Sequence, residues 1–309
     1  MDLDSLRAFV RVAELGSFTR AAEQLGLAKS RVSSRVDALE TALGTKLLLR
    51  TTRAVSLTPD GALLLGRARG LVRDADELAG LFSAPRALRG TVRVDLPIHL
   101  ARALVIPRLP ELFAAHPELS LVLSTTDRRV DVVREGFDCV LRVGTLGDSR
   151  LVSRRLGALP MVACASPAYL LKYGTPRTPA DLVQHRVVHY AARLDGGAPS
   201  FDYREGRRSV SVPMQSSLTV NAADAYTAAC LAGLGIIQSP RVGLASHLAT
   251  GSLVEVLPDY RASAMPVSLL HAHGRSVPKR VRAVMDFLAR VLAPYLSSAA
   301  LGLVEEPGA

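Results

Sequence analysis

Residues 17–57, SFTRAAEQLGLAKSRVSSRVDALETALGTKLLLRTTRAVSL, set the fold of the N-terminal part of this chain. Apolar residues recur at helical spacing on both sides of Gly26, so the stretch predicts two helices joined by a tight turn. Gly44 ends the second helix, and LLLR (47–50) and AVSL (54–57) predict the two strands of a wing. We therefore expect a helix-turn-helix followed by a basic wing, with a further amphipathic helix before it.

The outward face of the second predicted helix suits DNA. This helix begins near Lys29, and opposite its apolar stripe stand short hydroxyls and long cations, which can contact base edges and phosphates in a major groove. Arginines on the wing would neutralise backbone phosphates. The candidate DNA-binding residues are Ser17, Thr19, Lys29, Ser30, Arg31, Ser33, Ser34, Arg35, Arg50 and Arg53. The alternative is a small helical domain with a solvated polar face, which the broken turn and the basic wing disfavour.

A long helix is expected after the wing. Thr58-Pro59-Asp60 predicts its start, because it offers a hydroxyl cap, a proline in the first turn and an acid at the positive helix end. Apolar residues then alternate at spacings of four and three, as in a coiled-coil seam: Leu64, Ala68, Leu71, Ala75, Leu78 and Phe82. A seam without a partner in its own domain predicts pairing with a second copy; packing against the downstream domain is the alternative. The segment 84–91 predicts a hinge.

Composition narrows the classes of function. The 309 residues carry a formal net charge of +10, which favours nucleic acid as partner, with an anionic membrane surface second. There is no apolar run of the roughly 18 residues needed to span a bilayer, and no signal-peptide pattern, so we expect a cytoplasmic protein without a membrane partner. The three cysteines lack metal-ligand or disulfide-framework spacing, so buried thiols and neither metal nor cofactor are expected.

From Val92 onward the pattern becomes that of an α/β domain. Four apolar segments predict strands: TVRVDL (91–96), LSLVLS (119–124), DCVLRV (138–143) and PMVACA (160–165). Helices are expected over 100–115 and 129–135, which favours a largely parallel sheet covered by helices. The later chain predicts strands near 186–190, 209–213, 235–239 and 267–272, helices over 221–235 and 277–292, and a polar turn at 204–208.

Residues 1–82 resemble the winged helix-turn-helix and linker helix of LysR-type transcriptional regulators. The resemblance rests on four runs: A-A-x-x-L-G (21–26), V-S-x-x-V-x-x-L-E-x-x-L-G (32–44), L-L-x-R-T-T-R (47–53) and L-T-x-x-G (57–61). Downstream, three runs are similar to the effector domain of that family: D-x-V-x-E-G-F-D-C-V-L-R-V-G (131–144), C-A-S-P-A-Y-L (164–170) and A-C-L-A-G-L-G-I (229–236).

The resemblance implies an α+β multi-domain chain with a DNA-binding domain (1–58), a linker helix and hinge (59–86) and a periplasmic-binding-protein-like effector domain (87–309). The effector domain would contain two α/β subdomains, one of about 91–163 plus 267–295 and one of about 164–266. It also implies dimers that pair through linker helices and assemble into tetramers, dyad-symmetric DNA sites, a small-molecule effector and RNA polymerase as a partner.

Two segments depart from the family pattern. Ala28-Lys29 opens the recognition helix where a hydroxyl residue is usual, so the side-chain cap is lost, which typically costs about 1 kcal/mol. Residues 96–100, LPIHL, replace a small hydroxyl and an aromatic-Gly pair at the first effector helix. The effector preference of relatives is therefore not transferred.

The effector site is expected beyond the carboxyl ends of parallel strands, near helix N-termini. The candidate residues are Pro97, Ile98, His99, Thr125, Asp127, Arg142, Gly144, Ser166, Asn221 and Ala222. Arg142 favours a small carboxylate or other anion, unless it forms a structural pair with Asp127 or Asp138. His99 could instead be a surface or capping histidine, and Asp127 could cap the next helix.

The sequence thus favours a ligand-responsive transcription factor whose geometry on DNA changes when a small, anionic or aromatic effector binds between the two α/β subdomains. A solute-binding protein is the first alternative, which the basic N-terminal domain and the lack of an export signal disfavour. An enzyme is the second, and the chain lacks a nucleophile elbow, a P-loop, a metal-ligand cluster and a dinucleotide fingerprint.

Overall fold

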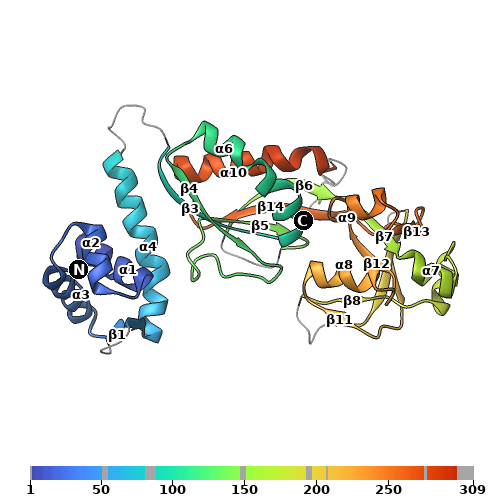
Figure 1. Cartoon of the computed structure of the whole chain (residues 1–309), viewed down its shortest axis with the longest axis horizontal. Coiled ribbons are helices and arrows are strands. Elements are labelled where there is room, and N and C mark those ends of the chain that lie inside the picture. Colours follow the sequence, from blue (N-terminus) through green and yellow to red (C-terminus); the bar gives the residue numbers. More distant parts are fainter. Residues whose placement is uncertain are drawn as a thin grey trace, which may run out of the picture.

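The computed structural model describes residues 2–50, 55–80, 88–146, 151–192, 197–206, 208–274 and 277–297, without the side chains of 73, 74 and 77–80. A helical head, a long helix and two α/β subdomains follow one another along the longest axis of the molecule (Figure 1). Among the described residues, no helix is both long enough and apolar enough to cross a membrane.

The head confirms the predicted winged helix-turn-helix. Its elements are α1 (Leu3–Leu15), α2 (Phe18–Leu25), α3 (Lys29–Leu43), β1 (Leu48–Arg50) and β2 (Val55–Leu57), with the two strands antiparallel. Phe9, Val36 and Leu39 are fully buried in the core that the three helices share. Gly26 adopts φ of +63° at the end of α2, a left-handed conformation that glycine reaches without strain, and this allows the tight turn into α3.

Helix α4 (Pro59–Gly80) follows the wing, and its start is capped as expected, since the Gly61 amide donates to the Thr58 hydroxyl at 2.9 Å. The prediction that its apolar seam lacks a partner in its own domain is wrong for the first two seam residues, Leu64 and Ala68. Ala68 is fully buried in the head core and Leu64 packs against the same core, because the head leaves one side open for α4. Leu71 is 52% exposed. Phe82 and the side chain of Leu78 lie outside the described residues.

Subdomain I is built on a five-stranded sheet of order β4-β3-β5-β14-β6. The strands are β3 (Gly90–Leu96), β4 (Leu119–Thr125), β5 (Cys139–Val143), β6 (Val152–Leu159) and β14 (Met265–His271). The expectation of a largely parallel sheet holds only for β4, β3 and β5, because β14 returns from subdomain II and pairs antiparallel with β5 and β6. Helix α10 (Lys279–Leu292) packs its apolar stripe on this sheet beside α6 (Leu109–Ala115), as Figure 1 shows.

The helices predicted in subdomain I differ from the observed ones. The stretch 98–115 is helical but irregular, with α5 (Ile98–Leu100), a π-helical turn η1 (Ala101–Val105) and a 3-10 turn η2 (Ile106–Arg108) before α6. Pro107 and Pro110 lack the backbone donor that a regular helix needs there. The helix expected over 129–135 is absent, and that described stretch forms turns in which side-chain carboxylates accept the amides of Asp131, Val133 and Arg134.

Subdomain II has a three-stranded antiparallel sheet of order β12-β7-β13, formed by β7 (Met161–Ala165), β12 (Ile237–Pro240) and β13 (Val254–Val256). Around it lie the parallel pair β8 (His189–Tyr190) and β11 (Thr219–Val220) and the hairpin of β9 (Ser200–Glu205) and β10 (Arg208–Pro213). Its helices are α7 (Pro167–Tyr173), the 3-10 helix η3 (Pro179–Gln184), α8 (Ala223–Leu231) and α9 (Arg241–Ala249).

Several expected boundaries shift in this subdomain. The polar turn expected over 204–208 is tighter, because Arg204 and Glu205 belong to β9 and Arg208 to β10. The chain enters subdomain II at Pro160 and leaves it between Val256 and Met265, so the expected division at 163 falls inside β7. Two chain crossings side by side leave a space between the sheets, and that space is the setting of the candidate pocket.

Candidate effector pocket and DNA-binding face

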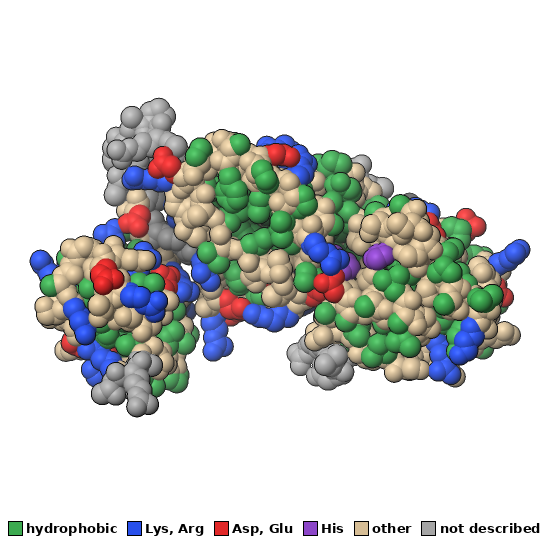
Figure 2. All heavy atoms as spheres, in the orientation of Figure 1, with side chains coloured by type: hydrophobic (Ala, Val, Ile, Leu, Met, Phe, Trp, Pro, Cys, Tyr) green, Lys and Arg blue, Asp and Glu red, His purple; other side chains and the backbone are tan. Residues whose placement is uncertain are grey.

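The outward face of α3 is polar and solvent-exposed. Lys29, Ser30, Arg31 and Ser34 are exposed, while Ser33 and Arg35 are partly covered. Lys and Arg side chains stand out on the visible surface of the head in Figure 2. Arg53 lies outside the described residues. Of the six predicted DNA-binding residues on α3, four are therefore exposed and two are half-buried.

The wing arginine Arg50 is fixed against α3. Its guanidinium donates to the Ser33 hydroxyl at 3.0 Å and to the Asp37 carboxylate at 2.6 Å, and its Cζ atom lies 4.5 Å from the centroid of the Phe18 ring. Arg35 is held similarly, since it donates to the Asp4 carboxylate at 2.7 Å. These contacts position both cations without removing them from solvent, so phosphate could compete for them.

The ends of the head helices show which predicted roles are structural. Ser17 caps α2, its hydroxyl accepting from the Arg20 amide at 3.3 Å, while Thr19 is exposed on the same helix. Ala28 stands at the N-cap of α3 and makes no side-chain cap, as its residue type predicts. The exposed Lys29 follows at the positive end of the helix, where a phosphate would be favoured.

Sequence reasoning missed Glu40, which joins α3 to the wing. This carboxylate is 3% exposed and accepts the amides of Leu47 and Leu48 at 2.9 and 3.2 Å and the Lys46 ammonium at 2.7 Å. Burial raises the pKa of Glu40, but these hydrogen bonds outweigh burial and hold the pKa below its usual value. The signal available in the sequence was a glutamate directly after Leu39, which belongs to the apolar stripe of this helix.

A cavity of about 1070 Å³ lies between the two subdomains. Of the predicted effector residues, Pro97, His99, Asp127, Arg142 and Gly144 line it. Ile98, Thr125, Ser166, Asn221 and Ala222 stand outside its wall among the described residues. Ser166 is 3% exposed and its side chain caps α7. Asn221 is exposed to solvent, and α8 begins one residue later than predicted, with Ala222 at its N-cap.

Arg142 combines a structural pair with a free donor. Its Nη1 donates to the Asp95 carboxylate at 2.8 Å, so the pairing with Asp127 or Asp138 that the sequence left open is not formed. Its Nη2 is buried and has no hydrogen-bond partner among the described residues. Asp95 is completely buried and also accepts from the Thr126 hydroxyl at 3.1 Å. Arg142 lines the cavity, and a guanidinium nitrogen without a partner is a charged hydrogen-bond donor from which an anion can accept.

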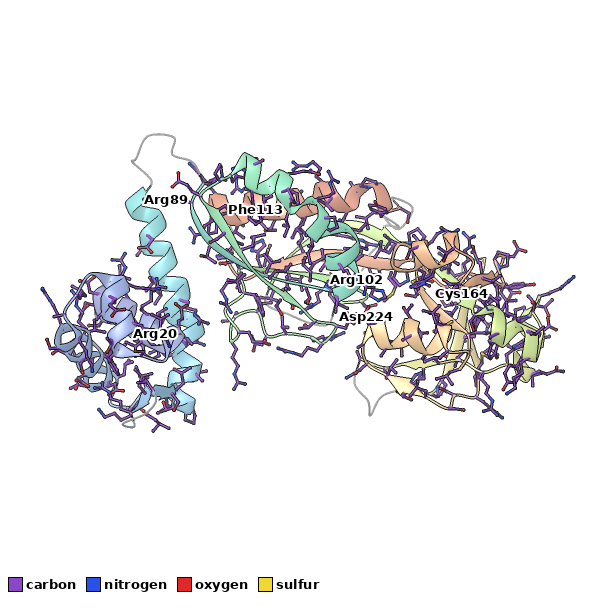
Figure 3. The ribbon with its side chains drawn as sticks, viewed as in Figure 1. Arg20, Arg89, Arg102, Phe113, Cys164 and Asp224 are labelled. Carbon is purple, nitrogen blue, oxygen red and sulfur yellow. The ribbon has the colours of Figure 1, made fainter. Side chains whose placement is uncertain are left out.

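Three polar contacts join the subdomains at the start of α8. The Asp127 carboxylate of subdomain I accepts from the Ala223 amide at 2.7 Å, so it caps a helix, but one in the other subdomain. His99 Nε2 lies 2.6 Å from the Asp224 carboxylate, and Arg102 lies 3.3 Å from the same group. Figure 3 shows Arg102 and Asp224 facing each other across this junction. His99 is therefore a bridging residue.

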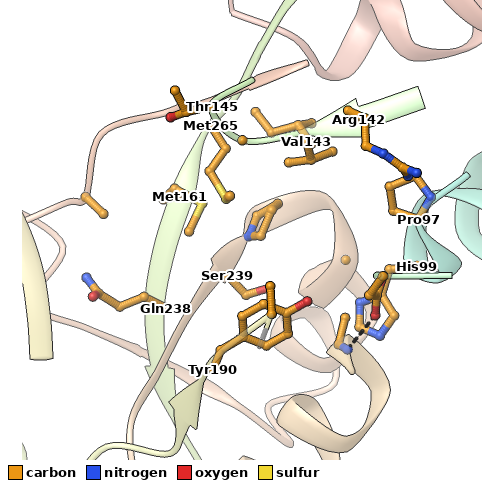
Figure 4. A pocket seen from close by; sticks show the side chains of 18 of the residues that line it. Pro97, His99, Arg142, Val143, Thr145, Met161, Tyr190, Gln238, Ser239 and Met265 are labelled. Atoms are coloured by element: carbon orange, nitrogen blue, oxygen red, sulfur yellow. Dashed lines mark hydrogen bonds between the residues drawn. The ribbon is translucent and has the colours of Figure 1, made fainter. Parts of the chain in front are cut away.

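Several wall residues were not anticipated. Figure 4 shows Met161, Met265, Tyr190, Gln238 and Ser239 around the same cavity as His99 and Arg142. Desolvation, followed by the nearby Asp127 carboxylate, raises the pKa of Tyr190 to about 12 although 37% of the residue is exposed. Its hydroxyl can donate a hydrogen bond at neutral pH, as a tyrosine with the ordinary pKa of about 10 also can. These residues come from strands that are distant in sequence, so no local motif marked them.

The three cysteines are buried free thiols, and the Cys230 thiol donates to the Cys164 carbonyl at 3.5 Å. Burial raises the pKa of the Cys139 thiol, and a hydrogen bond with Cys230 followed by burial raises that of Cys164. Cys139 and Cys164 are therefore poor nucleophiles.

The chain matches two family models and many regulators. Residues 3–62 match the model of the bacterial regulatory helix-turn-helix protein, lysR family, and residues 85–293 match the LysR substrate binding domain. An uncharacterised HTH-type transcriptional regulator of Escherichia coli K12, YhjC, is 42% identical over 295 residues, covering 95% of this chain and 99% of that protein. The HTH-type transcriptional activator AaeR of Escherichia coli K12 is 33% identical over 291 residues, covering 93% and 92%.

Among solved structures, CrgA, a LysR-type transcriptional regulator from Neisseria meningitidis, is 28% identical with a TM-score of 0.58, covering 94% of this chain and 98% of that chain. The family models and the names of these relatives are those of transcriptional regulators, not of enzymes. With a winged helix-turn-helix head and an effector domain that together span nearly its whole length, this chain belongs to the LysR family of DNA-binding transcriptional regulators.

Proposed function

We propose that the protein binds dyad-symmetric promoter sites as a dimer or tetramer and changes its DNA-bound geometry when a small anionic effector occupies the cavity between the subdomains. The observation that carries the proposal is the buried Nη2 of Arg142, a charged donor without a partner among the described residues. Met161, Met265 and Val143 surround the same cavity. The effector is thus a small carboxylate with an apolar or aromatic body.

The effector can be tested with benzoate, which combines a carboxylate with an apolar ring. Benzoate in excess should raise the melting temperature of the full chain, by the usual linkage between binding and folding. The double variant D95N/R142M removes the cation without leaving a buried carboxylate unpaired, and it should lose this response. The single variant D95N is the matched control and should keep it. A double variant that responds as fully as D95N would remove Arg142 from the effector site.

The partners follow from the head and from α4. Leu63 and Leu71 are 62% and 52% exposed on α4, which supports pairing of this helix with a second copy. Two heads related by a dyad would read two half-sites of a promoter, in the cytoplasm, where RNA polymerase is a further partner. Sedimentation of the L63E/L71E variant should show a smaller species than the parent. If the oligomer persists unchanged, α4 is not the pairing surface.

A further inference from the structure

Helix α4 makes one very close contact with the effector domain of its own chain. A Cβ atom added at Gly66 would lie 2.4 Å from the Val133 carbonyl oxygen and 2.9 Å from that of Arg134, so only glycine fits there. From the other side, a Cβ at Gly136 would lie 3.9 Å from the Gly66 Cα. Figure 1 shows α4 standing between the head and subdomain I. The two backbones are therefore packed against each other at this point.

The head is tied to the same contact. The Arg69 side chain runs beside Gly136, and its Nε donates to the Glu14 carboxylate of α1 at 2.9 Å. A groove lined by residues of α4 and of segment 129–135 borders the contact. A shift of segment 131–136 would thus displace α4, the helix on which the head packs.

The opposite end of this segment forms part of the effector pocket. Residues 126–130 line the cavity, and Arg129 borders both the cavity and the groove at α4. The buried Asp95 carboxylate accepts from both Thr126 and Arg142, so an anion on Arg142 would act two hydrogen bonds away from the start of the segment. The Asp127 carboxylate also accepts from the Ala223 amide at the start of α8 in subdomain II. A change in closure of the cavity would therefore displace the segment directly.

Internal contacts make the segment a stiff unit. Arg128 donates to both oxygens of the Glu135 carboxylate, at 2.9 and 2.5 Å, and the same carboxylate accepts from the Asp131 amide. Asp131 in turn accepts from the Val133 and Arg134 amides at 3.1 and 2.9 Å. The segment therefore transmits a displacement along its length better than a loop without such bonds.

We infer that residues 126–136 form a strut that docks the linker helix at Gly66 and couples the effector pocket to the position of the DNA-binding head. The docking is a property of the free chain, whereas the coupling rests on the proposed effector function. The strut thus has two discrete partners, the cavity wall and α4, whose positions it makes interdependent.

Gly70 offers a matched control for Gly66. Both glycines lie inside α4, where alanine favours the helix equally, but a Cβ at Gly70 meets no described atom within 4 Å. Spin labels at E23C in the head and E118C in subdomain I report their separation, because both positions are exposed and the native cysteines are buried. An excess of unlabelled chain isolates the distance within one chain. The parent and G70A should give the same narrow distance distribution, and G66A a displaced or broader one.

A second variant approaches the strut from the effector side. R128A frees Glu135 without touching the head, and it should also broaden the distribution. The docking would be overturned if G66A and G70A gave the same distance distribution. If both of these glycine variants shifted it equally from that of the parent, the shift would reflect a change in the helix itself. These measurements need neither DNA nor an effector.

The coupling is tested with benzoate and the DNA upstream of the gene. The quantity measured is the ratio of the DNA affinities with and without benzoate. In the parent and G70A this ratio should differ from one severalfold. In G66A it should approach one, although G66A should still bind benzoate. A G66A ratio equal to that of the parent would overturn the coupling. A parent that does not bind benzoate contradicts the proposed effector class and leaves the distance experiment decisive for the strut.

Discussion

The head and the effector pocket differ in how far apart in the sequence their candidate functional residues lie. In the head, the candidate DNA-binding residues lie within positions 17–53, and the described ones belong to α2, its N-cap, α3 and the wing. In the pocket, Pro97, Arg142 and Gln238 line one cavity although about 140 residues separate the first from the last. A recognition face on one helix depends on local periodicity, whereas a cavity between subdomains depends on how two sheets are joined.

The largest expected effect tests whether these two regions are also independent in stability. Phe9 is fully buried in the head core, and F9A should lower the free energy of unfolding of the head by about 3–5 kcal/mol. Hydrogen exchange should accelerate in α1 and α3 but not in β5 or β14. F287A, at a site 1% exposed in subdomain I, should give the reverse pattern. Equal acceleration in both regions would make the chain one cooperative unit.

DNA binding should respond to the head alone. S33A/R35A removes a hydroxyl and a cation from the recognition face and should weaken binding to the specific site about a hundredfold, since each good base contact contributes about 1–3 kcal/mol. A salt-titrated shift assay with the upstream DNA measures this loss. R177A removes the same charge from subdomain II and should bind almost as the parent does. Unchanged affinity of S33A/R35A would contradict the assigned face.

The buried Glu40 should make the head sensitive to acid. Its pKa in the folded state is lowered, so its contribution to stability is complete above the ordinary value of 4.5 and is lost as the pH falls through the folded-state pKa. E40Q should cost about 2 kcal/mol at pH 7, because hydrogen bonds to a charged group are lost, and should lose less further stability between pH 5 and 3. Urea unfolding between pH 7 and 3 measures the loss at pH 7 and the further loss in acid. E23Q, at an exposed position, is the control. Parallel pH profiles for E40Q and the parent would contradict the assignment.

The smallest expected effect concerns the opening of the recognition helix. A28S would supply the missing side-chain cap of α3 and should stabilise the head by about 1 kcal/mol. Thermal unfolding of the head detects a gain of this size. A destabilised A28S would mean that the first turn of α3 is held by something other than its cap.

Prediction from sequence succeeded where chemistry and periodicity coincide in a short segment. The cap at Thr58 and the glycine turn at Gly26 appear as expected, because they depend only on neighbouring residues. It failed over 129–135, where helical spacing of apolar residues was overridden by the Asp131 and Glu135 carboxylates. It also failed for Leu64 and Ala68, whose heptad spacing is equally compatible with the chain's own head as partner.

Local sequence was sufficient for the winged helix-turn-helix, the polar face of α3 and the long helix after it, since helix periods, caps and glycine turns act over a few residues. The partners of distant groups required the folded chain. Arg142 could have paired with several carboxylates, and the sheet places the buried Asp95 beside it. Asp127 could have capped a helix nearby, and the two chain crossings bring α8 to it instead. The close packing of Gly66 on Val133 likewise exists only because α4 and the strut meet in space.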